Sequence, residues 1–311
     1  MLRSALLYLS SSEAIKEFTA RSGIARRLAH RFVAGETLEE AISVALELNR
    51  RGMSTEIDYL GENTTSLEQA DAAAAAYLSL LEAASSARAD AQASLKLTQM
   101  GLDLSYDHCV ANVSRVVRFA GERGNFVWVD MESSEYVDRT LELYRHLLSE
   151  CGNVGVAIQS YLFRSKRDVQ ELLARGATIR LVKGAYMEPS QVAFPDKSDV
   201  DKSFSILAEM LLDSGRLQAI ATHDEKLIEH VARFAEEHHI GRDGFEFQML
   251  YGIRRDLQEE LVSEGYRLRV YVPYGDQWYP YLMRRMAERP ANLFFVAGNV
   301  VKETISGRKA A

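Results

Sequence analysis

Eight short runs rich in β-branched and aromatic residues recur along the chain, separated by longer segments with apolar residues at helical spacing. The runs lie at 54–60, 94–98, 126–130, 154–159, 177–182, 217–222, 245–249 and 267–272. Strands that alternate with helices pair in parallel through right-handed crossovers, and eight such units close into a barrel. The pattern therefore predicts an α/β protein built as a TIM-like (β/α)8 barrel. An open, doubly wound sheet is the alternative, but it seldom needs eight regular units.

Local start and stop signals support the helical segments between the runs. Thr37, followed by Glu39 and Glu40, is typical of a helix N-cap, because its hydroxyl can accept a hydrogen bond from the first turn. Asp224 and Glu225 place acidic side chains at the positive N-terminal end of the segment 224–239. Glycines stand where five helical segments should end, at positions 152, 176, 215, 241 and 265.

The chain divides into three parts around this repeat. Residues 1–50 are predicted to form two or three extra helices, roughly at 11–31 and 36–50, packed on the barrel. The catalytic barrel is expected over residues 51–297. The polar stretch 298–311 is predicted to be a flexible tail.

Composition excludes several classes of partner. The 311 residues are 47% apolar and 26% charged, with a net charge of −7, which argues against a nucleic acid bound through its phosphates. Cys109 and Cys151 are far apart, as expected of idle thiols in a reducing cytosol. No run approaches the roughly 20 apolar residues of a spanning helix, so we expect a cytoplasmic protein with at most peripheral membrane contact, through the apolar start 1–9. No HExxH, CxxC pair or compact carboxylate cluster indicates a metal.

Polar residues lie in or just after all eight runs, where a barrel places its active site. They are Glu62, Lys96, Asp130, Gln159, Arg180, Lys183, Thr222, His223, Asp224, Glu246, Gln248, Arg269 and Tyr271. Any single one could be a barrel-filling residue paired with its neighbours. Polar groups on eight consecutive strands instead favour a site at this rim.

The segment YLMRRMAE adds a second polar cluster. Tyr281, Arg284 and Glu288 share one helical face, and Arg285 reaches the same ligand only from the flank. Two adjacent guanidiniums suit a carboxylate or a phosphate. Composition alone favours the alternative, a solvated helix face with an Arg–Glu pair. The chain has no GxGxxG, P-loop or GxSxG motif, so a dinucleotide would need a site of another kind.

Six stretches resemble motifs of the proline dehydrogenase family and occur in the family's order. They are Tyr59-Leu-Gly-Glu62, Arg180-Leu-Val-Lys-Gly-Ala-Tyr186, Ala221-Thr-His-Asp224, Phe245-Glu-Phe-Gln-Met-Leu-Tyr-Gly252, Tyr271-Val-Pro-Tyr-Gly275 and Tyr281-Leu-Met-Arg-Arg-Met-Ala-Glu288. Together they span roughly residues 50–296. The resemblance is to the monofunctional bacterial type, and it implies a distorted (β/α)8 barrel that holds FAD.

The resemblance also implies roles for the matching residues. Arg180 and Asp130 are expected to be the catalytic residues. Arg180 would lie near flavin N5, and Asp130 would orient Lys96 or a neighbouring tyrosine. The other flavin contacts implied are Met131, Gln159, Lys183, Gly184, Ala185, Thr222, His223 and Glu288. Lys96, Arg284 and Arg285 match the cations that receive the proline carboxylate, and Tyr271 and Tyr281 match aromatics on its ring. Glu62 matches a gate glutamate that can pair with the second arginine.

The implied reaction is oxidation of L-proline to Δ1-pyrroline-5-carboxylate by hydride transfer to the flavin. A quinone is the expected electron acceptor, and a separate pyrroline-5-carboxylate dehydrogenase would consume the product. Two alternatives remain open. A Schiff-base aldolase could use Lys96 or Lys183 at the rim, and a non-catalytic barrel could serve as a binding scaffold.

Overall fold

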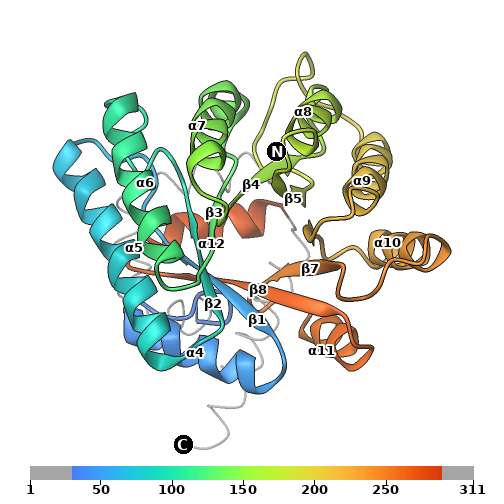
Figure 1. Ribbon diagram of the computed structural model, residues 1–311, viewed down its shortest axis with the longest axis horizontal. Coiled ribbons are helices and arrows are strands. Elements are labelled where there is room, and N and C mark those ends of the chain that lie inside the picture. The colour runs from blue at the N-terminus through green and yellow to red at the C-terminus, as the bar shows by residue number, and fades with distance from the viewer. Residues whose placement is uncertain (1–29, 289–311) are drawn as a thin grey trace, which may run out of the picture.

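The computed structural model describes residues 30–288, with side chains for residues 30–283 (Figure 1). Eight parallel strands hydrogen-bond in sequence order into one closed barrel, β1 back to β8, which confirms the predicted fold class. The strands are β1 (Ser54–Tyr59), β2 (Ala91–Leu95), β3 (Val127–Val129), β4 (Val154–Gln159), β5 (Thr178–Val182), β6 (Gln218–Ala221), β7 (Phe245–Leu250) and β8 (Arg267–Tyr274).

Helices surround the barrel, and α5 to α11 connect successive strands (Figure 1). They are α4 (Leu38–Arg50), α5 (Leu67–Ala87), α6 (Tyr106–Gly121), α7 (Val137–Glu150), α8 (Ser165–Leu173), α9 (Lys197–Leu212), α10 (Glu225–Glu237), α11 (Arg255–Ser263) and α12 (Trp278–Glu288), with a short 3₁₀ turn, η1 (Ser134–Tyr136), before α7. Within residues 30–288, no helix combines the length and apolar character needed to cross a membrane.

The ends of the helices follow the sequence signals in part. Thr37 and Glu40 form a capping box, in which Glu40 N donates to Thr37 Oγ1 and Thr37 N donates to Glu40 Oε2. Asp224 precedes α10, but its side chain makes no cap hydrogen bond. It accepts a hydrogen bond from Lys183 instead.

Helix α4 contacts β1, β8 and α5, so it fills the place in the outer ring beside the first and last strands. Its buried face is Ala41, Ile42, Ala45 and Leu48. Helix α12 follows β8 and packs its first turns on Phe32, Val33 and Leu60. Because α4 covers the outside of β8, α12 can contribute side chains to the mouth of the barrel.

The largest difference from the expected strand boundaries is at the second strand. We expected the second strand at 94–98, but β2 ends at Leu95. The chain turns there, since Met100 N donates to the carbonyl oxygens of Lys96 and Leu97. Lys96 therefore lies in the loop after β2, at the carboxyl end of the barrel.

Candidate active site

A cavity of about 430 Å³ opens at the carboxyl ends of the barrel strands. Its lining includes Gln159, Val182, Ala221 and Leu250, which are the last residues of β4, β5, β6 and β7. Every residue to which the family resemblance gives a role, and whose side chain is described, lines this cavity. They are Glu62, Lys96, Asp130, Met131, Gln159, Arg180, Lys183, Gly184, Ala185, Thr222, His223, Tyr271 and Tyr281. Arg284, Arg285 and Glu288 lie outside the side chains that the structure describes.

Arg180, on β5, is buried at the floor of the cavity. Its Nη2 donates to Glu56 Oε2 at 2.6 Å, and its Nη1 donates to Asp130 Oδ1 at 2.8 Å. The guanidinium also lies over the Trp128 ring, with 4.6 Å from Cζ to the ring centroid. Burial alone would lower the pKa of Arg180, but Glu56 and Asp130 outweigh burial and raise it. Arg180 therefore keeps a fixed positive charge at this position.

Lys96 is held at the opposite side of Asp130. Its Nζ donates to Asp58 Oδ2 at 3.0 Å and to the Tyr271 hydroxyl at 3.2 Å, and it lies 3.1 Å from Asp130 Oδ2. Burial would lower the pKa of Lys96, but Asp58 and Asp130 raise it well above the usual value. A lysine that stays protonated is a poor nucleophile, which argues against a Schiff base at this residue.

Asp130 connects the two cations. One carboxylate oxygen faces Arg180 and Ser94, and the other faces Lys96 and the Tyr271 hydroxyl. Burial would raise the pKa of Asp130, but Lys96 and Arg180 lower it. The residue expected to orient Lys96 or a tyrosine thus contacts both.

Two of the polar residues expected at the rim lie deeper in the barrel. Arg269 donates through Nε to Glu246 Oε1 at 2.9 Å and through Nη1 to the Thr55 carbonyl oxygen at 2.8 Å. Neither Arg269 nor Glu246 lines the cavity. For this pair, the alternative of barrel-filling residues paired among themselves is correct.

Three buried polar atoms of cavity-lining residues find no hydrogen-bond partner among residues 30–283: Arg180 Nε, Gln159 Oε1 and Gln248 Oε1. The first two suit a planar, hydrogen-bonding ligand. Gln159 Nε2 is engaged, since it donates to the carbonyl oxygens of Met131 and Glu132. A buried donor and a buried acceptor without partners are costly unless a ligand engages them. An isoalloxazine ring offers both kinds of group, so these residues fit a flavin.

The β5–α9 loop forms another wall of the cavity. Gly184 has a φ of +113°, and a Cβ at this position would lie 2.5 Å from the Tyr161 ring. The Lys183 ammonium donates to Asp201 Oδ1 at 2.6 Å and to Asp224 Oδ2 at 2.9 Å. Lys183 therefore lines the cavity with its charge already paired.

Thr222 and His223 follow the carboxyl end of β6 and line the cavity. The backbone N–H of Leu250 donates to His223 Nε2 at 2.8 Å, which joins the β6 and β7 ends. Thr222 Oγ1 accepts a hydrogen bond from Asp224 N at 3.1 Å. These bonds set the direction of both side chains at the rim.

Sequence reasoning missed the acidic residues that hold the two cations. Glu56 and Asp58 both lie on β1 and point to the barrel interior, where they pair with Arg180 and Lys96. The signal was present, because two acids two residues apart within one β-rich run fall on the same face of a strand. In the described part of the chain, no three His, Cys, Asp or Glu side chains are arranged to hold a metal ion.

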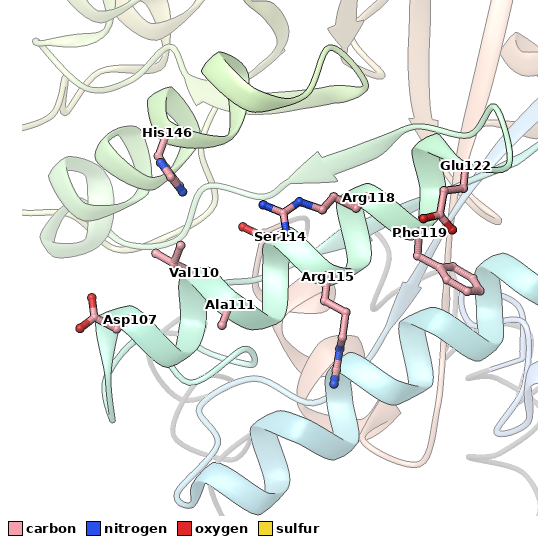
Figure 2. Close-up of a pocket in the computed structure, with 9 residues that line it drawn as sticks. All are labelled: Asp107, Val110, Ala111, Ser114, Arg115, Arg118, Phe119, Glu122 and His146. Atoms are coloured by element: carbon pink, nitrogen blue, oxygen red, sulfur yellow. The ribbon is translucent and has the colours of Figure 1, made fainter.

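A second hollow, of about 630 Å³, lies on the outer side of α6, with His146 of α7 at its edge (Figure 2). Its ionisable side chains, Asp107, Arg115, Arg118, Glu122 and His146, are exposed. None of the predicted site residues with a described side chain lines it. The barrel cavity is therefore the better candidate for an active site.

Comparisons with known proteins agree with this geometry. The family model for proline dehydrogenase matches residues 41–298. The chain is 42% identical to "Proline dehydrogenase 1" of Bacillus subtilis (strain 168) over 303 residues, covering 97% of this chain and 100% of that protein. It is 46% identical to "Proline dehydrogenase" of Deinococcus radiodurans over 280 residues, covering 88% and 90%.

A solved structure shows the same architecture. The crystal structure of proline utilization A (PutA) from Bdellovibrio bacteriovorus inactivated by N-propargylglycine superposes with a TM-score of 0.80 at 28% identity. The match covers 88% of this chain and 34% of that longer protein. The family model, the full-length relatives and the barrel fold agree on the family of this chain. The chain belongs to the proline dehydrogenase family.

Proposed function

We propose that this protein oxidises L-proline to Δ1-pyrroline-5-carboxylate. The observation that carries the proposal is the single cavity in which Arg180, Lys96 and Asp130 meet at the carboxyl end of the barrel. Family membership brings a flavin cofactor, and we propose that this flavin is FAD. When bound, the flavin supplies the acceptor for the hydride that leaves the substrate.

The residues proposed to hold the flavin, apart from Glu288, line the cavity. Arg180 Nε and Gln159 Oε1 are the buried groups that a flavin ring would engage. Met131, Lys183, Gly184, Ala185, Thr222 and His223 are the further proposed contacts. The role proposed for Glu288 rests on the family resemblance, because its side chain is not described.

The substrate side of the proposal rests on cations and aromatic walls. Lys96, with Arg284 and Arg285, would receive the proline carboxylate, and a fixed carboxylate sets the angle of the ring before reaction. The two arginines lie outside the described side chains and rest on the resemblance alone. Tyr271 and Tyr281 line the cavity and would pack on the ring, where they exclude water. Glu62, whose Oε1 lies 3.9 Å from Lys96 Nζ, is the proposed gate.

The proposed partners complete the reaction. Electrons would pass to a quinone, and a separate pyrroline-5-carboxylate dehydrogenase would consume the product. We propose a cytoplasmic enzyme that contacts a membrane at most peripherally. These assignments rest on the family resemblance.

The test uses the purified full-length chain. It should be yellow, with flavin absorption at about 450 nm, and L-proline should reduce an artificial electron acceptor in its presence. D-proline serves as the matched control, because it presents the same groups in mirror geometry. A colourless protein that borohydride inactivates in the presence of a carbonyl substrate would instead identify a Schiff-base lyase. A flavin-bound protein that proline fails to reduce would also overturn the proposed activity.

A further inference from the structure

One cluster of charged side chains at the cavity holds more carboxylates than cations. Two cations, Arg180 and Lys96, are in ion-pair contact with four carboxylates. The carboxylates are Glu56, Asp58, Asp130 and Glu62. If all six groups were charged, the cluster would carry a net charge of −2. That surplus opposes both an anionic substrate and an electron-rich reduced flavin, so its size matters for the reaction.

Within this cluster, Glu56 is the carboxylate that pairs with Arg180, the residue proposed to face the flavin. It lines the cavity, is only 1% exposed, and lies 2.6 Å from Arg180 Nη2. Asp130 accepts a hydrogen bond from the other terminal nitrogen of Arg180, Nη1. The remaining donor of the guanidinium, Nε, has no partner among the described residues. Two carboxylates thus fix the plane of the guanidinium and determine which donor remains for a ligand.

We infer that Glu56 is a positioning residue for the flavin: it orients Arg180 toward the ring, and its own charge offsets part of the fixed positive charge that Arg180 presents there. This inference rests on the proposed function, because it assumes that Arg180 faces a flavin. It extends that function by assigning the site a proton-dependent control that involves neither the substrate carboxylate nor the cofactor's own chemistry.

The surroundings of Glu56 move the loss of its proton close to neutral pH. Burial raises the pKa of Glu56 to about 7, although Arg180 and Arg269 lower it. The charged groups that face Glu56 come from four other parts of the barrel wall: Arg180, Asp130, Arg269 and Glu246. Loss of the proton adds a negative charge beside Arg180, which disfavours the reduced flavin.

The test measures the midpoint potential of the flavin in the holoenzyme between about pH 6 and about pH 8.5. In the wild-type protein, the potential should fall more steeply through neutral pH, with an inflection where Glu56 loses its proton. Glu56→Gln should remove the inflection and raise the potential at high pH, since the amide stays neutral. The expected rise corresponds to a ten-fold or larger gain in the ratio of reduced to oxidised flavin, which is about 30 mV for a two-electron couple.

Glu132→Gln is the matched control. Glu132 is also buried with its pKa raised to about 7 by burial, but its carboxylate accepts hydrogen bonds from Thr98 and does not contact Arg180. This variant should keep the inflection. Loss of the inflection in Glu132→Gln, or its persistence in Glu56→Gln, would overturn the inference.

Two further readouts keep the inference testable on its own. If Glu56→Gln does not fold, a wild-type potential without an inflection in this pH range rejects the inference without any variant. If the variant folds, its rate of flavin reduction by proline should change more than its KM for proline, because Glu56 contacts the arginine proposed for the flavin. A protein that binds no flavin, or that proline does not reduce, would contradict the proposed function itself. A proline-reducible enzyme in which Glu56→Gln matches the wild type would contradict only the role of Glu56.

Discussion

Lys96 and Asp58 form a buried ion pair, with 3.0 Å between Lys96 Nζ and Asp58 Oδ2. Asp58 lies on β1 and Lys96 follows β2, so the pair joins two adjacent strands where the cavity begins. The Tyr77 hydroxyl, on α5, donates to the other Asp58 oxygen at 3.3 Å. A buried charge depends strongly on its partner, because removal of one member leaves the other uncompensated.

Asp58→Asn should therefore destabilise the fold. Lys96 would still have Asp130 as an ion-pair partner. We therefore expect the free energy of unfolding to fall by about 3 kcal/mol, the low end for a broken buried pair. Tyr77→Phe is the control, since it removes only one neutral donor, and it should cost about 1 kcal/mol. Urea unfolding of the two variants measures both values. Equal losses would show that the ion pair contributes nothing beyond a hydrogen bond.

Asp130→Asn should reduce turnover more than stability. The amide cannot satisfy Arg180 and Lys96 together, so both cations should shift within the cavity. Charge-assisted hydrogen bonds contribute about 1.5–3 kcal/mol each, which predicts a fall of about 10- to 100-fold in kcat/KM for proline. Ser94→Ala, which removes a neutral donor to the same carboxylate, should reduce kcat/KM less than ten-fold. An Asp130→Asn enzyme with wild-type kcat/KM would disprove the orienting role of Asp130.

The fold was predictable because the strand–helix alternation is local in the sequence. All eight expected strands exist, and β4 occupies 154–159 as predicted. The error at β2 arose because Lys96, Leu97 and Thr98 continue a β-rich pattern. Their backbone instead enters a turn, which only the contacts around Met100 reveal. Short strand boundaries of this kind depend on tertiary contacts that periodicity does not encode.

The grouping of the site residues was predictable from their place after the strands, but their depth was not. Arg269 and Glu246 looked equivalent to Arg180 and Asp130 in the sequence, yet they pair below the cavity. The stagger of the strands decides which layer an inward side chain joins, and a single sequence does not specify that stagger. Glu56 and Asp58 were overlooked although their spacing places both on one face of β1, because the sequence does not show which cations they meet inside the barrel.

Gly184→Ala should impair flavin binding. The residue has a φ of +113°, and the added Cβ would lie 2.5 Å from the Tyr161 ring, so both backbone and ring would have to move. We expect lower flavin content after purification and a lower Tm. Gly215→Ala is the matched control, because its φ is +66° but nothing lies within 4 Å of the new Cβ. It should lower Tm without loss of flavin. Equal flavin content in both variants would mean that Gly184 does not shape the cofactor wall.

Glu132 should make the protein less stable as the pH rises. Burial raises the pKa of its carboxyl group to about 7, although hydrogen bonds from Thr98 lower it. The folded protein then keeps this proton over a pH range in which the unfolded chain, with a pKa of 4.5, loses it. The free energy of unfolding should accordingly fall from about pH 4.5 to about pH 7, by up to about 3 kcal/mol for this residue.

The measurement is urea unfolding of wild type and Glu132→Gln at a series of pH values. Because the amide does not titrate, the variant should gain stability relative to wild type as the pH rises, by up to about 3 kcal/mol. Thr98→Ala should act in the opposite direction. It removes the hydroxyl that donates to the carboxylate at 2.6 Å, so the pKa of Glu132 should rise further and the pH-dependent loss should extend to higher pH. A constant difference between Glu132→Gln and wild type at all pH values would show that Glu132 is ionised in the folded protein, with Thr98 as a sufficient partner for the charge.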